Sequence, residues 1–322
     1  MAFTSVRRLK MYPFSSIMYG MNVVIENEFL RAEISSLGAE IHRLTRKSDS
    51  SEIIWNGDPS VWKNHAPVLF PFIARCLDGY FVMDGERKEF SRNHGFFRDS
   101  ETELVRSDAV SAEFRLHESP ATLEKFPYRF SVTVAYALSD CTLGWRITVS
   151  NTGDRPFRFS LGTHAAFSCP RGTDPAGTEN SCYRIEFEKR EPLVSVVCTP
   201  EGYLAADEEG CSPVTAPYGE AEPGIIPLDG RGFGNGHLFT AFTSDWAGLR
   251  NMLDGSLVRI STRGFPYCMI WQNMGNPEFV CIEPWYGLPD AENTDHDWNK
   301  KPGMIDLEPG CEFTSIQDIH VG

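Results

Sequence analysis

The feature that most constrains the fold is a series of short segments in which apolar and polar residues alternate. Residues 130–138 form the clearest segment, and residues 145–150 follow it across a turn at Ser139 and Asp140. A period of two predicts β-strands that each bury one face. Further alternating segments occupy residues 112–116, 183–188 and 257–262. Asp-Gly pairs, which are typical of hairpin turns, stand at residues 84–85 and 254–255.

Many short strands with almost no full-length helix predict an all-β fold, a large antiparallel β-sandwich. One short helix is indicated, because Asp58 can cap it, Pro59 can open it and Pro67 follows soon. No linker or change of composition divides the chain. We therefore expect residues 21–322 to form a single domain with only short helices.

Charge and cysteine content exclude several classes of function. The 322-residue chain has a formal net charge of −14, which disfavours nucleic acid and anionic membranes as partners. It has no run of ~18 apolar residues that would predict a membrane-spanning helix. Its nine cysteines are irregularly spaced and include no Cys-x-x-Cys pair, which indicates reduced thiols and a cytoplasmic location.

Residues 1–20 differ from the rest because they contain Arg7, Arg8 and Lys10 but no acidic residue. A signal peptide would need ~7–15 continuous apolar residues after these charges, and Pro13 with its polar neighbours interrupts any such run. We expect a disordered extension or a start codon assigned too far upstream, with Met18 or Met21 as the working start.

His164 stands alone among small and apolar residues, just after a strand-like run. Such a histidine is either a core residue satisfied by backbone or a group placed for proton transfer. Taken alone, the core interpretation is favoured, because buried titratable groups are only sometimes functional. The small neighbours Gly162, Ala165 and Ala166 would leave room for a ligand ring if the second interpretation holds.

Glu283 is predicted to end the apolar strand 279–282, with Pro284 stopping the strand and Trp285 and Tyr286 following. A carboxylate between an apolar strand and aromatic rings is partly desolvated, which raises its pKa and makes it a better base. The alternative is a solvent-facing glutamate on an edge strand, and the local sequence leaves the two balanced.

Two further candidates lie in the first third of the chain. His94 is followed by Gly95, which allows a ligand to approach the backbone closely. Arg75 ends the apolar run 67–74, where its guanidinium could form a hydrogen-bonding fork for a polar ligand. The alternatives are an exposed histidine in a turn and a surface arginine. No His-x-His pair and no His-Glu-x-x-His motif occurs, so metal-centred cupins and zinc proteases lack their ligands.

Taken together and in this order, these segments resemble the aldose 1-epimerase (galactose mutarotase-like) family, and most closely its LacX-like branch. The resemblance runs from about Met21 to the C-terminus. It rests on residues 26–40, Leu69-Phe70-Pro71-Phe72-Ile73-Ala74-Arg75, Asn93-His94-Gly95-Phe96, Gly162-Thr163-His164, Phe265-Pro266-Tyr267 and Ile282-Glu283-Pro284-Trp285-Tyr286-Gly287.

The resemblance implies a large antiparallel β-supersandwich with a sugar site in a cleft on its concave side, and no metal or organic cofactor. It implies that Glu283 is the general base and His164 the general acid. His94 and Arg75 would bind sugar hydroxyls. Asp245 and His237 are the candidates for a further sugar-binding residue, and Trp285, Tyr286 and Trp62 for stacking on the sugar.

The implied activity is interconversion of the α and β anomers of a free hexose such as glucose or galactose, by acid–base ring opening at C1. One alternative is the same reaction on a sugar phosphate, for which Arg98, Arg92 or Lys63 could supply positive charge. A non-catalytic carbohydrate-binding sandwich is the alternative from another class. The expected partner is a small sugar, and the expected state is a monomer or a homodimer.

Overall fold

The computed structural model describes residues 20–170, 182–205, 213–219, 222–228, 233, 236–273 and 278–322. The predicted N-terminal extension, apart from Gly20, lies outside the described residues. The described chain is built almost wholly of strands, and every pair of named strands is antiparallel. This confirms the predicted all-β class.

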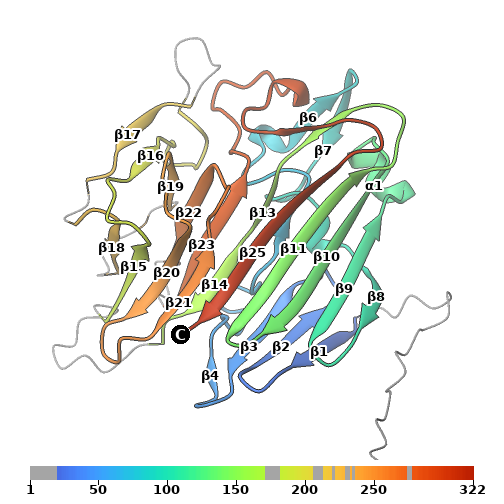
Figure 1. The fold of residues 1–322 in the computed structure, drawn as a ribbon. Helices are drawn as coiled ribbons and strands as arrows, with labels where there is room; N and C mark the ends of the chain where they lie inside the picture. Colours follow the sequence, from blue (N-terminus) through green and yellow to red (C-terminus); the bar gives the residue numbers. More distant parts are fainter. Residues whose placement is uncertain are drawn as a thin grey trace, which may run out of the picture.

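Two large sheets dominate the described chain (Figure 1). The nine strands of the larger sheet run in the order β18 (Ile225–Pro227), β15 (Tyr183–Phe187), β20 (Trp246–Asn251), β21 (Leu257–Ser261), β25 (Glu312–Val321), β11 (Thr142–Asn151), β10 (Phe130–Ser139), β9 (Ser111–His117) and β8 (Glu103–Ser107).

The second large sheet carries the site. Seven of its strands run in the order β17 (Thr215–Pro217), β16 (Val194–Val196), β19 (His237–Thr240), β22 (Tyr267–Trp271), β23 (Phe279–Tyr286), β13 (Leu161–Thr163) and β5 (Val68–Leu69). The eighth, β14 (Ala165–Ser168), pairs with another part of β23.

Three small sheets and four short helices complete the described chain. The small sheets are β1 (Asn22–Glu26), β2 (Leu30–Ser35), β3 (Ile41–Arg46) and β4 (Ser51–Glu52), then β6 (Tyr80–Met83) with β7 (Glu86–Glu89), then β12 (Phe157–Phe159) with β24 (Ile305–Leu307). The helices are α1 (Pro120–Lys125), η1 (Leu77–Gly79), η2 (Phe97–Asp99) and η3 (Trp298–Lys300). No described helix is long and apolar enough to cross a membrane.

The two large sheets share one hydrophobic core. Val134 and Ile147 of the nine-stranded sheet belong to the same buried cluster as Ile270 and Ile282 of the second sheet. A buried hydrogen bond also joins the sheets, from Thr163 Oγ1 on β13 to Gln317 Oε1 on β25, 2.9 Å away. The alternating strands bury one face each in this core, as their period predicts.

Two local predictions were wrong. Residues 58–61 form a single turn rather than a helix, with the Asp58 carboxylate accepting hydrogen bonds from the backbone and hydroxyl of Ser60. The strand that was expected to end at Glu283 continues to Tyr286. Pro284 fits inside it, opposite Cys268. Glu283 is therefore in the middle of a central strand and not at an edge.

Candidate active site

A cavity of about 1300 Å³ lies against the second large sheet. Glu283, His164 and His237 line it from the sheet, and Trp62, Arg75, His94 and Arg98 line it from the connections between residues 62 and 98. The cavity therefore contains the predicted acid–base pair, Glu283 and His164, together with His94 and Arg75, two of the residues predicted to bind substrate.

Glu283 is a buried carboxyl group on the cavity wall. It pairs with Met269 on β22, and only 1% of its surface is exposed. Neither carboxylate oxygen has a hydrogen-bond partner in the described part of the chain. Burial therefore raises the pKa of Glu283 well above its ordinary value near 4.5, because desolvation penalises the charged form.

His164 lies at the break between β13 and β14, and its backbone N–H donates to the Pro67 carbonyl, 3.0 Å away. Its Nε2 is 3.4 Å from Glu283 Oε2. Burial, followed by repulsion from the Arg98 guanidinium, lowers the pKa of His164 to about 3. The ring of Trp62 stacks on the imidazole at 4.9 Å and shields it further.

His94 is held as a neutral hydrogen-bond donor. Its backbone is in the left-handed region at φ 69°, and its N–H donates to the Ala74 carbonyl. The Ala74 N–H donates in turn to His94 Nδ1, at 3.0 Å, which leaves the ring proton on Nε2. Burial and then the charge of His164 lower the pKa of His94 well below its ordinary value.

Arg75 is positioned by a buried ion pair that sequence reasoning did not identify. Lys301 Nζ lies 2.6 Å from Asp290 Oδ1, and both side chains are at most 2% exposed. Asp290 Oδ2 accepts the backbone N–H of Leu77 at 2.9 Å, and the Asp290 N–H donates to the Arg75 carbonyl. The pair therefore anchors the segment that presents Arg75 to the cavity.

Arg98 lines the cavity and influences His164, a role that its position in the sequence did not indicate. It lies on η2 beside the cavity, its side chain is only 10% exposed, and its Nε has no hydrogen-bond partner among the described residues. Burial lowers the pKa of Arg98 below its ordinary value. Local sequence could not reveal this, because only the fold places η2 against His164.

The remaining candidates divide into those inside and outside the cavity. His237 on β19 and Trp285 on β23 both line it. The structure does not bring Asp245 there: its side chain is 42% exposed and pairs with Arg263 Nη2 at 2.5 Å. Tyr286 packs on Phe265 and Phe313, at 4.4 Å and 5.0 Å between ring centres, and is not part of the lining.

The small residues beside His164 serve packing and do not make room for a ligand. A Cβ on Gly162 would lie 2.6 Å from Trp285 Cδ1. Ala165 and Ala166 are fully buried and are not part of the cavity lining. The interpretation that these positions leave space for a bound ring was therefore wrong.

Gly95 allows the His94 turn to lie against Phe70. Its φ is +72°, and an added Cβ would be 2.2 Å from the Phe70 carbonyl oxygen. We expect Gly95→Ala to lower the free energy of unfolding by about 3 kcal/mol or more, because backbone strain and overlap with main-chain atoms add.

The matched control is Gly85→Ala, because Gly85 has a φ of +77° with no atom within 4 Å of the added Cβ. We expect a loss of about 1 kcal/mol from backbone strain alone. Urea denaturation of both variants measures the difference, and equal losses would contradict the role assigned to Gly95.

Several residues of the cavity lining carry buried polar atoms that have no hydrogen-bond partner in the described chain. These atoms are both carboxylate oxygens of Glu283, Nδ1 of His164, Nε1 of Trp285, Oγ of Ser195 and Nε of Arg98. Buried polar atoms are normally hydrogen-bonded, so such a set marks a site for a polar ligand. The adjacent proton donor and acceptor can exchange protons with that ligand.

Two groups of described residues could hold a metal ion, since their ligand atoms lie within 4.8 Å of one another. One is His164, Cys281 and Glu283, inside the site. Burial raises the pKa of the Cys281 thiol well above its ordinary value, which disfavours the thiolate that a metal would need. The other is Glu40, His42 and His65.

Comparisons with known proteins bear on the family and the fold of the chain. The family model described as aldose 1-epimerase matches residues 21–192. The plasmid-encoded protein LacX of Lactococcus lactis subsp. lactis is 25% identical over 308 residues, which cover 94% of this chain and 99% of LacX.

Solved structures give the same result. A galactose mutarotase-like protein from Lactobacillus casei ATCC 334 has a TM-score of 0.85 at 27% identity, over 94% of this chain and 100% of the other. A galactose mutarotase-related enzyme from Lactobacillus acidophilus has a TM-score of 0.82 at 26% identity, over 94% of this chain and 97% of that one.

Proposed function

The chain belongs to the aldose 1-epimerase family, and we propose that it interconverts the α and β anomers of an aldose, with a free hexose such as glucose or galactose as substrate. The observation that carries this proposal is the pairing of His164 with Glu283, 3.4 Å apart on a cavity wall with unpartnered polar atoms. A pure binding site has no need for both a proton donor and a proton acceptor.

In the proposed reaction, a base removes the proton from the C1 hydroxyl while an acid protonates the ring oxygen, and the C1–ring oxygen bond breaks. The open aldehyde turns about C1–C2, and the reverse transfers close the ring. The pair must therefore hold one proton in total and be able to hold it on either member.

The surroundings of the pair support this role. Burial raises the pKa of Glu283 and lowers that of His164, so a proton shared by the pair is favoured on Glu283 over His164. Transfer of that proton to His164 gives the carboxylate base and imidazolium acid that the family resemblance assigns to them. Sugar hydroxyls that donate to the Glu283 oxygens favour this form, because hydrogen bonds to a carboxylate stabilise its charge.

Polarimetry on freshly dissolved α-glucose and α-galactose tests the proposal. We expect the purified protein to speed equilibration well beyond the buffer blank. Rates equal to the buffer blank for every aldose tried would contradict the proposed enzymatic activity. If calorimetry then showed sugar binding without anomer exchange, the protein would be a non-catalytic carbohydrate-binding sandwich. A cytoplasmic location is part of the proposal and rests on the cysteine pattern.

A sugar phosphate is the second candidate substrate, favoured by the charge of the cavity. Four cations line it, namely Lys63, Arg75, Arg92 and Arg98, whereas Glu283 is the sole acidic residue of the described lining. Such a concentration of positive charge contrasts with a net charge of −14 for the whole chain. Arginine is well suited to bind phosphate through paired hydrogen bonds.

We expect Arg98→Met to separate these candidates. If the substrate is a sugar phosphate, kcat/KM for glucose 6-phosphate should fall by about 10-fold or more, since charged hydrogen bonds contribute ~1.5–3 kcal/mol. Glucose turnover should change far less. The matched control is Arg263→Met, because Arg263 is exposed and outside the cavity. An equal loss on both sugars would contradict a phosphate-binding role.

A further inference from the structure

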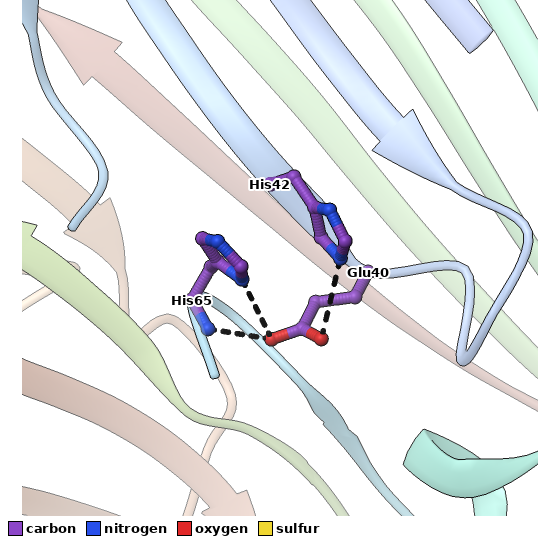
Figure 2. Close-up of side chains that lie close together, drawn as sticks. All are labelled: Glu40, His42 and His65. Atoms are coloured by element: carbon purple, nitrogen blue, oxygen red, sulfur yellow. Dashed lines mark hydrogen bonds and ion pairs between the residues drawn. The ribbon is translucent and has the colours of Figure 1, made fainter. Parts of the chain in front are cut away.

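Glu40, His42 and His65 form a second cluster of metal-ligand side chains, separate from the acid–base pair (Figure 2). Glu40 directly precedes β3, and His42 is the extra residue at a bulge where β3 pairs with β2, between Ile41 and Arg43. His65 comes from the connection before β5. The three ligand atoms lie within 4.8 Å of one another.

Glu40 is held in place as a charged ligand. Its Oε1 accepts the backbone N–H groups of His65 and Ala66, at 2.6 Å and 3.0 Å. Its side chain is only 8% exposed, so these bonds fix the orientation of the carboxylate. Oε2 faces His42 Nε2 at 3.7 Å.

The two imidazoles converge on this carboxylate without bonding to it closely. His65 Nδ1 is 3.8 Å from Glu40 Oε1, and it is buried with no hydrogen-bond partner in the described chain. The rings stack at 4.2 Å, and Figure 2 shows a nitrogen of each ring facing Glu40. Separations of 3.7–3.8 Å are too long for hydrogen bonds.

These separations suit a shared cation. Ligand atoms about 2.0–2.2 Å from a tetrahedral zinc ion are roughly 3.3–3.5 Å apart, so the separations need to shorten by a few tenths of an ångström. The stacked rings, whose planes are 20° apart, must also rotate so that each directs a nitrogen at the ion. Two imidazoles and a carboxylate suit zinc, cobalt and nickel better than magnesium or calcium. The His42 side chain is 31% exposed, which gives a path for the ion and for water.

We propose that Glu40, His42 and His65 bind one divalent cation of the zinc class. The ion would tie β3 to the segment 62–67. The carbonyl of His65 accepts the N–H of Ala166, and the carbonyl of Pro67 accepts that of His164. The site therefore supports the wall that carries the acid–base pair without contacting the substrate.

Cobalt binding to the chelator-treated protein tests this proposal, because Co²⁺ reports its ligands in its absorption spectrum. We expect one equivalent to bind with visible bands typical of nitrogen and oxygen ligands and no thiolate charge-transfer band. The melting temperature should rise by about 2 °C or more when the ion is in excess.

Variants of His42 decide the outcome. His42→Ala should no longer bind the equivalent of Co²⁺, and its melting temperature should no longer rise with the ion. His42→Gln, which keeps a polar side chain, should behave in the same way. The control His117→Ala removes an exposed histidine of β9 and should keep both. Failure of the wild type to bind, unchanged binding in both His42 variants, or a thiolate band would each overturn the proposal.

Discussion

Glu283→Gln is expected to lower kcat by about 10²–10⁴-fold, the range that a positioned acid–base group contributes. Glutamine has nearly the same shape, so the strand and the cavity should be preserved, but it cannot take up the proton of the C1 hydroxyl. Polarimetry under saturating sugar measures the loss. A kcat within about threefold of the wild type would contradict the catalytic role.

The same substitution should not weaken the fold, which separates catalysis from stability. The pKa of Glu283 is raised above its unfolded value near 4.5, so above that pH the unfolded state loses a proton that the folded state keeps. The wild type therefore loses stability as pH rises through this window, and the glutamine variant does not. We expect its melting temperature at pH 7 to equal or exceed that of the wild type.

His164 shifts stability in the opposite direction. Its pKa is about 3 in the folded protein against 6.5 for a free imidazole. Below pH 6.5 the unfolded state gains a proton that the folded state does not, so this group costs stability as pH falls. The pH series of the Glu283→Gln variant should retain this acid-side loss.

Lys301→Met is expected to cost about 3–5 kcal/mol of folding free energy, because it leaves the Asp290 carboxylate buried without its cation. The effect should extend to substrate binding, since Asp290 also holds Leu77 and the carbonyl of Arg75. We expect KM to rise more than kcat falls. Thermal unfolding and sugar-dependent rates measure the two effects.

The neighbouring residue provides a control. Lys300 is 68% exposed and pairs with the surface residues Asp295 and Asp297, so Lys300→Met should change stability by no more than about 0.5 kcal/mol. If the double variant Asp290→Asn/Lys301→Met is more stable than Lys301→Met alone, the unpaired Asp290 carboxylate is the cause of the loss. If Lys301→Met lost no more stability than Lys300→Met, the result would contradict the role assigned to the buried ion pair.

Much of the fold could be predicted from sequence because burial of one strand face imposes a period of two. The strands at 130–139 and 142–151 are long enough for the pattern to be unambiguous. The end of β23 was misplaced because a proline normally interrupts hydrogen bonding, and local sequence does not show that position 284 tolerates one.

The site was only partly predictable, because the positions of its side chains depend on contacts between distant parts of the chain. His164, Glu283, His94 and Arg75 stand out by residue type against apolar neighbours. Their convergence depends on the pairing of β13 with two strands far away in the sequence, β5 and β23. Arg98 and the Asp290–Lys301 pair owe their roles to burial, which no local pattern encodes. Asp245 matched by residue type, yet the fold directs it to solvent.

Glu283 lies in β23, and His164 lies between two strands that pair with β23. Trp62, Arg75 and His94 come from connections in the first third of the chain, and Arg98 comes from the short helix η2. Sheet geometry resists change, and connections tolerate substitution and insertion. For the proposed function we therefore expect substrate preference to diverge by variation between residues 62 and 98, with the proposed proton-transfer step unchanged. Chimaeras that exchange this segment between relatives would be a direct route to new sugar specificities.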